Sequence, residues 1–249
     1  MRFRIIGPGR AGGAFARALT QVGWELDRSY GRHRDVSAAA AGVPILLICV
    51  PDRAVASVAA AVSPGDAVVL HVAGSLGLDV LAEHERIGSV HPLMTMPDAE
   101  RGAARLLDSC HFAVAGDPVA TAIVEALGGL AFTVEDEQRT LYHATAAVAS
   151  NHLVALTAQV ARLATAAGVP AEAFWPLMAA SLTNVAETDP ATALTGPAAR
   201  ADWETVRRHR TALATLAPAA APAEDLVLYE TLAAAAARLA GHEPPEDLS

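Results

Sequence analysis

Hydrophobic positions in the first 134 residues follow two alternating patterns. Seven short, β-rich runs have the length of strands, and between most of them apolar residues recur at helical spacing. The predicted strands are Phe3–Gly7, Trp24–Tyr30, Pro44–Val50, Ala67–Val72, Arg86–His91, His111–Ala115 and Leu130–Val134, and the predicted helices include Ala11–Val22, Arg53–Val62 and Pro118–Leu127. A run such as PILLICV, apolar throughout, is typical of a parallel strand covered on both faces. The pattern predicts a doubly wound parallel α/β sheet.

The strand pattern ends at the acidic stretch EDEQ, residues 135–138. One long helical pattern then runs from residue 139 to Gly168, where the glycine and the following Pro170 end it. Further helical runs lie around 171–186, 203–216 and 222–240. We therefore expect two domains, a sheet domain over 1–134 and an all-helical domain over 135–249.

Composition restricts the classes of partner. The chain has 249 residues, of which 53% are hydrophobic, and a formal charge of −9, which argues against nucleic acid as a partner. It contains no apolar run of the roughly 18 residues that a membrane span needs. Cys49 and Cys110 form no C-x-x-C motif, which favours reduced thiols in a cytoplasmic protein. The nine histidines show no metal-binding spacing, so we expect no metal.

A glycine-rich loop follows the first predicted strand and opens a predicted helix. Its residues are Gly7, Pro8, Gly9, Arg10, Ala11 and Gly12, which match G-x-G-x-x-G. In this motif the first glycine permits the tight turn, the second admits a pyrophosphate, and the third lets helix and strand pack closely. The phosphates then lie at the N-terminus of the helix. This context predicts a dinucleotide-binding Rossmann domain rather than an ordinary glycine-rich turn.

The residues after the second predicted strand indicate which dinucleotide binds. An NAD site places an acidic residue there for the ribose 2′-hydroxyl, whereas an NADP site uses arginine for the 2′-phosphate. Asp27 lies inside the strand, but Arg32 and Arg34 follow it, and Arg10 lies in the glycine loop. These residues favour NADP(H), with a solvated surface loop as the alternative interpretation.

Other candidate contacts lie where later strands end. Ligands of open α/β sheets bind beyond the carboxyl ends of the strands. Val50, Pro51 and Asp52 end the third predicted strand and should therefore lie along the cofactor. His71 and His91 end the next two, and we assign His71 to the cofactor and His91 to the reacting end.

Six stretches in register resemble one family over essentially the whole chain. They are GPGRAGGAFARAL, CVPDRAV, HVAGSLG, SVHPLMTM, YHATAAVASNHLVAL and LTGPAARAD. Together they are similar to Rossmann-like proteins with a DUF2520-type helical C-terminal domain, related to 6-phosphogluconate dehydrogenase-like and pyrroline-carboxylate reductase-like enzymes. The resemblance implies an NADP-dependent oxidoreductase of a small molecule, a homodimer formed through the helices, and in some members ketopantoate reductase activity. Ala73 and Ala201 depart from the family pattern, which more often has serine and glycine there.

The chain contains no lysine, which limits its acid–base chemistry. Related hydroxyacid dehydrogenases use a lysine four residues before an asparagine on the long helix as proton donor. Here the asparagine is Asn151, and Ala147 stands at the lysine position. His143, one turn earlier, could donate the proton instead, as could His91, Ser150 or water. Asn151 could orient the substrate or form only an interhelical hydrogen bond.

Arg200 is the candidate for binding a substrate carboxylate, because a guanidinium can form two parallel hydrogen bonds to it. The alternative is a surface arginine paired with Asp202 or Glu204. The leading hypothesis is an NADPH-dependent reductase of a small carboxylate-bearing ketone, with ketopantoate as the best single substrate. A cyclic imino acid, another 2-oxo acid, or an inactive NADP-binding regulatory role are the alternatives.

Overall fold

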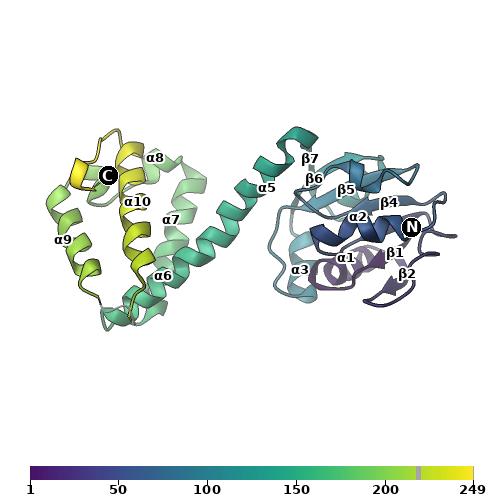
Figure 1. Ribbon diagram of the computed structural model, residues 1–249, viewed down its shortest axis with the longest axis horizontal. Coiled ribbons are helices and arrows are strands. Elements are labelled where there is room, and N and C mark those ends of the chain that lie inside the picture. The colour runs from purple at the N-terminus through teal and green to yellow at the C-terminus, as the bar shows by residue number, and fades with distance from the viewer. Residues whose placement is uncertain (217–219, 249) are drawn as a thin grey trace. The chain divides into compact units, whose positions relative to one another are not determined.

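The computed structural model describes residues 1–216 and 220–248, so the predicted helical domain includes four positions outside the described residues. The chain forms two compact units, Met1–Ser150 and Asn151–Ser249, each of which we describe by itself (Figure 1). This division falls later than the predicted boundary at residue 134. The first helix after the sheet remains in contact with the sheet. Arg139 forms a hydrogen bond with Ser89, and Tyr142 forms one with His91.

The first unit is built on a seven-stranded sheet with the order β2-β1-β3-β4-β5-β6-β7. The strands are β1 (Arg2–Ile6), β2 (Glu25–Tyr30), β3 (Ile45–Ile48), β4 (Val68–His71), β5 (Ile87–Pro92), β6 (His111–Gly116) and β7 (Leu130–Thr133). Each lies within two residues of a predicted strand at both ends. The predicted α/β class is therefore confirmed, and the carboxyl ends of β1, β3, β4 and β5 lie along one edge of the sheet.

The sheet is mixed rather than wholly parallel, which corrects the prediction. β5 and β6 are antiparallel, with His91 opposite Ala113, while the other neighbouring strands are parallel. After β5 the chain forms helix α3 (Ala99–Leu106) and returns to the same edge, where the Leu93 N–H donates to the His111 carbonyl. Because this connection does not cross the sheet, the next strand must run in the opposite direction.

Two hydrophobic cores cover the two faces of the sheet. Successive β3 residues alternate between them, with Ile45 and Leu47 in one core and Leu46 and Ile48 in the other. Helices α1 (Arg10–Gln21), α3 and α4 (Val119–Ala126) contribute to the first core, and α2 (Asp52–Ala60) contributes to the second. This double burial explains the absence of polar residues from the β3 sequence.

The long helix predicted from residue 139 to Gly168 is interrupted. It comprises α5 (Arg139–Ala147), a π-helical turn (Val148–His152) and α6 (Leu153–Ala166). The Ser150 hydroxyl donates to the Ala146 carbonyl within this turn. A π turn inserts one residue into the helical ladder and shifts the faces that follow. A regular helix would place His143, Ala147 and Ser150 on one face, and this turn interrupts that face.

The second unit is helical. After α6 it contains α7 (Trp175–Glu187), α8 (Pro190–Ala193), α9 (Trp203–Ala214) and α10 (Ala223–Leu239), with short 3₁₀ turns at Ala171–Phe174, Ala198–Arg200 and Glu246–Leu248. Arg162 on α6 forms a two-pronged ion pair with the buried carboxylate of Asp225 on α10. Within the described part of the chain, no helix has both the length and the hydropathy to cross a bilayer.

A buried histidine holds the turn that follows β4. His71 is completely buried, its Nε2 lies 3.2 Å from the Gly77 carbonyl oxygen, and its Nδ1 accepts from the Ala73 N–H at 3.2 Å. These partners fit a neutral ring that carries its proton on Nε2. Burial, which disfavours the charged ring, lowers the pKa of His71 to about 4. The folded turn therefore requires the neutral form.

This histidine makes the first unit sensitive to acid. Above about pH 6.5 the ring is neutral in both the folded and the unfolded protein. Below that pH the unfolded chain takes up the proton first. The free energy of unfolding should thus fall as the pH decreases from about 6.5 to about 4, by on the order of 3 kcal/mol for His71. The measurement is urea unfolding of the first unit at several pH values.

The variant His71→Asn should make this pH dependence shallower, because asparagine keeps an acceptor for Ala73 but does not titrate. His33→Asn is a matched control, since His33 is exposed and its φ of 67° is one that asparagine tolerates. An unchanged pH dependence in the His71 variant would show that other groups cause it.

Candidate active site at the carboxyl edge of the sheet

The three glycines of the first loop meet three different surroundings. A Cβ on Gly7, whose φ is +90°, would lie 2.6 Å from the Cys49 carbonyl oxygen, and one on Gly12 would collide with the Gly7 carbonyl. A Cβ on Gly9 would meet nothing within 4 Å. The fold therefore requires the outer two glycines, while Gly9 leaves open space before the first turn of α1. No side chain caps that turn, so its N–H groups are available to an anion.

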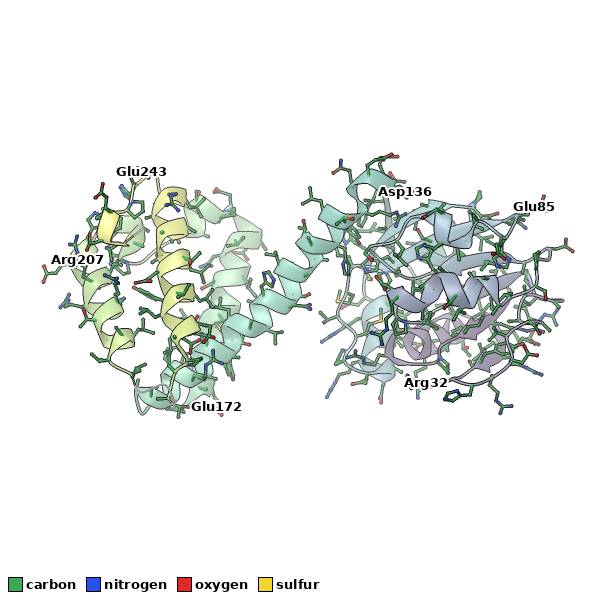
Figure 2. All side chains as sticks on the ribbon, in the orientation of Figure 1. Arg32, Glu85, Asp136, Glu172, Arg207 and Glu243 are labelled. Atoms are coloured by element: carbon green, nitrogen blue, oxygen red, sulfur yellow. The ribbon has the colours of Figure 1, made fainter. Side chains whose placement is uncertain are left out.

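The arginines after β2 lie beside this loop. The Gly7 N–H donates to the Tyr30 carbonyl, which joins the glycine loop to the end of β2. Arg32 and Arg34 follow on an exposed turn, and Figure 2 shows Arg32 at the margin of the unit. In the described chain neither guanidinium has a carboxylate partner, and the same holds for Arg10.

Asp27 has a different role from that of a ribose ligand. Its carboxylate lies 2.5 Å from the Arg4 guanidinium, and this hydrogen bond holds the pKa of Asp27 below its usual value. Asp27, the acidic residue of β2 nearest to its carboxyl end, is therefore paired with Arg4 of the neighbouring strand β1.

A series of contacts connects the ends of β3, β4 and β5. Val50 lies against Gly7, and Asp52 at the start of α2 accepts a 2.5 Å hydrogen bond from Ser75 in the turn after β4. The adjacent Gly74 packs under the ring of His91, where a Cβ would lie 2.7 to 3.0 Å from three ring atoms. The structure therefore brings the predicted residues Gly7, Asp52 and His91 to one edge.

His91 is paired with a tyrosine that the sequence did not point to. Its Nδ1 lies 2.6 Å from the Tyr142 hydroxyl on α5, and the two rings meet edge to face at 5.5 Å. The ring of His143 lies 6.3 Å from that of His91. Burial first, and then the neighbouring His143, lower the pKa of His91 to about 4. Burial raises the pKa of Tyr142 to about 12.

Behind this pair lies a buried cation that sequence reasoning also missed. Arg139, 1% exposed, donates to Asp136 at 2.8 Å and to the Ser89 hydroxyl at 3.0 Å. Figure 2 marks Asp136 at the turn that leads into α5. The third nitrogen, Nη1, is buried, and no described residue forms a hydrogen bond with it. An unpaired guanidinium nitrogen is costly, and buried groups of this kind are concentrated at functional sites.

Three predicted site residues have other surroundings. His71 offers neither ring nitrogen to a ligand, because both contact the backbone. Asn151 is exposed in the π-helical turn, and Arg200 is exposed at the end of a 3₁₀ turn in the second unit. Asp202 caps α9, and the described chain gives Arg200 no ion pair. Ala201 has a φ of 53°, which explains why glycine suits that position.

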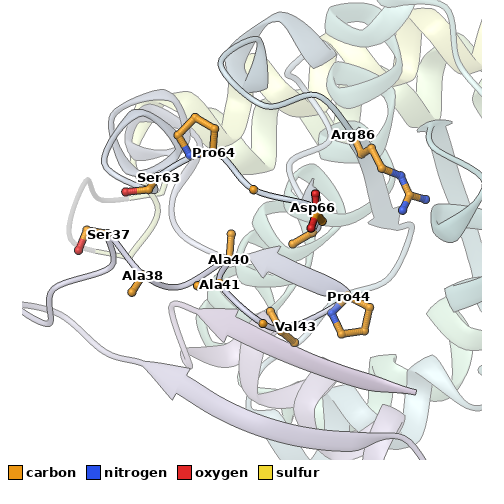
Figure 3. Close-up of a pocket in the computed structure, with 13 residues that line it drawn as sticks. Ser37, Ala38, Ala40, Ala41, Val43, Pro44, Ser63, Pro64, Asp66 and Arg86 are labelled. Carbon is orange, nitrogen blue, oxygen red and sulfur yellow. The ribbon is translucent and has the colours of Figure 1, made fainter.

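A hollow of the first unit lies at the opposite edge of the sheet. It measures about 640 Å³ and is lined by the loops that precede β3, β4 and β5, with Asp66 and Arg86 among the lining residues (Figure 3). Arg86 is paired with Asp117 at 2.9 Å. Since ligands of such sheets bind at the carboxyl ends, this hollow is not the candidate site. Among the described residues, no cluster of three metal-binding side chains is present.

Comparison with solved structures identifies similar folds. A candidate NADP oxidoreductase from Bacteroides fragilis superposes with a TM-score of 0.78 at 21% identity, covering 95% of this chain and 98% of its own. A protein from Thermotoga maritima gives 0.71 at 25% identity, covering 96% and 98%. Pyrroline carboxylate reductase from Plasmodium falciparum, with NADP bound, gives 0.63 at 11% identity, covering 96% and 98%.

No curated protein matches the chain significantly. One family model does match, and it covers residues 110–236, which is just over half of the sequence. Its description is a domain of unknown function, DUF2520. The match begins at β6 and extends through α5, the π-helical turn and most of α10. The chain therefore belongs to the DUF2520 family.

Proposed function

We propose that this protein is an NADPH-dependent reductase of a small carboxylate-bearing ketone, with 2-dehydropantoate as the best candidate substrate and pantoate as the product. The observation that carries the proposal is the open space at Gly9, between two glycines that the fold itself requires. A pyrophosphate needs such space next to a helix N-terminus. The His91–Tyr142 pair lies along the same edge of the same unit.

The residues present fit the cofactor. The loop from Gly7 to Gly12 would hold the pyrophosphate, and Arg10, Arg32 and Arg34 would bind the ribose 2′-phosphate. Val50, Pro51 and Asp52 would lie along the dinucleotide. NADPH bound in this way would supply a hydride. The likeness to structures described as an NADP oxidoreductase and as an NADP-bound reductase supports this choice of cofactor.

The remaining predicted residues would act on the substrate. Arg200 would bind its carboxylate, Asn151 would orient its carbonyl group, and His91 or His143 would deliver the proton. A cyclic imino acid is the second candidate substrate, favoured by the likeness to a pyrroline carboxylate reductase. An NADP-binding regulatory protein without chemistry is the third possibility, and a turnover assay separates it from the other two.

The variant Gly9→Ala should fold normally but bind NADPH at least about tenfold more weakly, which corresponds to about 1.4 kcal/mol. Alanine tolerates the backbone at this position, whose φ is −78° and ψ −151°, and its methyl group would enter the space for the pyrophosphate. Fluorescence titration with NADPH and thermal unfolding of the same sample measure the two effects.

Gly65→Ala is the matched control, because a Cβ there also meets nothing within 4 Å and the position lies in the hollow at the opposite edge. It should change neither quantity. Unchanged NADPH affinity in the Gly9 variant would exclude the glycine loop as the pyrophosphate site.

The substrate proposal is tested by following NADPH oxidation with 2-dehydropantoate, other 2-oxo acids and cyclic imino acids. With the substrate that reacts, Arg200→Ala should mainly raise KM, by roughly ten- to hundredfold, because a charge-assisted contact to the carboxylate is lost. Asn151→Ala should lower kcat. If NADPH binds but none of the compounds is reduced, the regulatory interpretation replaces the reductase.

We further propose that the protein is a homodimer formed through its helical unit. Large apolar side chains are exposed there on several helices, including Val154, Leu177, Leu182, Val227 and Leu232. Exposed large apolar side chains on several helices favour an interface. Light scattering at micromolar concentration should give the mass of two chains, and the mass of one chain would contradict the proposal.

A further inference from the structure

The proposed reductase lacks a lysine, so the origin of the proton must be found among other side chains. A ketone that accepts a hydride also needs one proton on its oxygen. His91 is the titratable group at the carboxyl end of β5, and it lies between Gly74 and Tyr142. The identity and protonation of this group therefore decide how the reaction can be completed.

His91 cannot serve as an imidazolium donor at neutral pH. Its ring is largely enclosed, and the burial that lowers its pKa to about 4 keeps it neutral. The charged and titratable groups that face it are Tyr142, His143 and Arg139 from α5, Asp52 from α2 and His71 from β4. Of these, only the Asp52 carboxylate favours a charged ring, and His143 and Arg139 oppose it. A neutral imidazole that donates the proton of one nitrogen must take up another proton at its second nitrogen.

The two ring nitrogens of His91 have different surroundings. Nδ1 lies 2.6 Å from the Tyr142 hydroxyl, a group that can donate to it. The structure records no described residue that bonds Nε2. With the hydroxyl donating to Nδ1, the neutral ring carries its proton on Nε2, the nitrogen that remains for a ligand. Gly74 is required here, because any side chain would displace the ring.

We propose that Tyr142 and His91 form a two-proton relay that protonates the product oxygen. This inference rests on the proposed reductase function and names its proton source. As the carbonyl carbon receives the hydride that NADPH supplies, the Nε2–H bond of His91 breaks and an O–H bond forms on the substrate. The Oη–H bond of Tyr142 breaks at the same time, and a new Nδ1–H bond forms. The tyrosinate then takes the proton back from Nδ1 while Nε2 takes one from solvent, which restores both groups.

Arg139 is the positioning residue of this relay. Its buried guanidinium is held by Asp136 and Ser89, and its positive charge favours the ionised form of Tyr142, against the burial that disfavours it. An alkoxide is a far stronger base than a phenolate, so the overall transfer is downhill. The relay explains why a cation is buried at the first residue of α5, where the helix dipole disfavours it.

The test is single-turnover reduction of the substrate that reacts in the screen. Tyr142→Phe should lower the rate by about a hundredfold while NADPH affinity stays unchanged. Tyr229→Phe is the matched control, because Tyr229 also bonds a histidine, His209, at 2.9 Å with an edge-to-face contact, in the second unit. The control should react at the unaltered rate. Equal rates for both variants would overturn the relay.

Two further readouts separate a relay from a structural role. The rate in mixtures of H₂O and D₂O should depend on deuterium content along a curve, since two protons move, and Tyr142→Phe should remove the curvature. The unaltered rate should be constant from about pH 6 to about pH 9, whereas a single imidazolium donor would lose activity over that range. A linear dependence on deuterium, or a rate that falls with pH, would contradict the relay.

A measurement without substrate keeps this inference distinct from the proposed function. ¹⁵N spectra of the histidine rings in the full chain, assigned with His91→Gln, should show His91 neutral at pH 7 with its proton on Nε2. A proton on Nδ1, or a charged ring, would overturn the relay whatever the enzyme reduces. If the ring is as expected but no compound is reduced, the reductase function fails instead.

Discussion

The close approach of the first helix to the first strand is the constraint on which the candidate site depends. Gly12 lies against the Gly7 carbonyl, and Gly7 lies against the Cys49 carbonyl, so neither position can hold a side chain. This packing aims the N-terminus of α1 at the carboxyl edge of the sheet. The same packing brings the end of β3, and with it Asp52, beside the loop. The glycine loop and the His91–Tyr142 pair therefore share one edge because three backbone segments meet there.

The second feature of that edge is its use of neutral histidines around a buried cation. His71 and His91 lie at the carboxyl ends of β4 and β5, and burial keeps both uncharged. Arg139 supplies the positive charge of the cluster and has one guanidinium nitrogen that no described residue pairs. Folding alone would favour an apolar residue there, since an incompletely paired buried charge is destabilising. The arrangement fits the proton relay that we propose.

The sequence was sufficient to predict the elements whose pattern is local. Strands β3 and β4 were found because buried parallel strands are continuous apolar runs, and both are buried at every residue. Helix α3 is not among the helices named from the sequence, and its Gly102 is a poor helix former. The structure gives the reason, since Gly102 and Ala99 pack against Ala14 and Gly13 on α1 with no room for larger groups. Tyr142 could not be singled out, because its role depends on a contact with His91, 51 positions earlier. The π-helical turn also has no signal in hydrophobic periodicity.

We propose that the carboxyl edge of the sheet binds NADPH through the glycine loop and the arginines after β2. Calorimetric titration of the unaltered protein with NADPH and with NADH tests this binding, because the two cofactors differ only in the 2′-phosphate. Both should bind, with NADPH at least about tenfold tighter, or about 1.4 kcal/mol. Equal affinities would contradict the role given to the arginines, and the absence of binding by either cofactor would contradict the site itself.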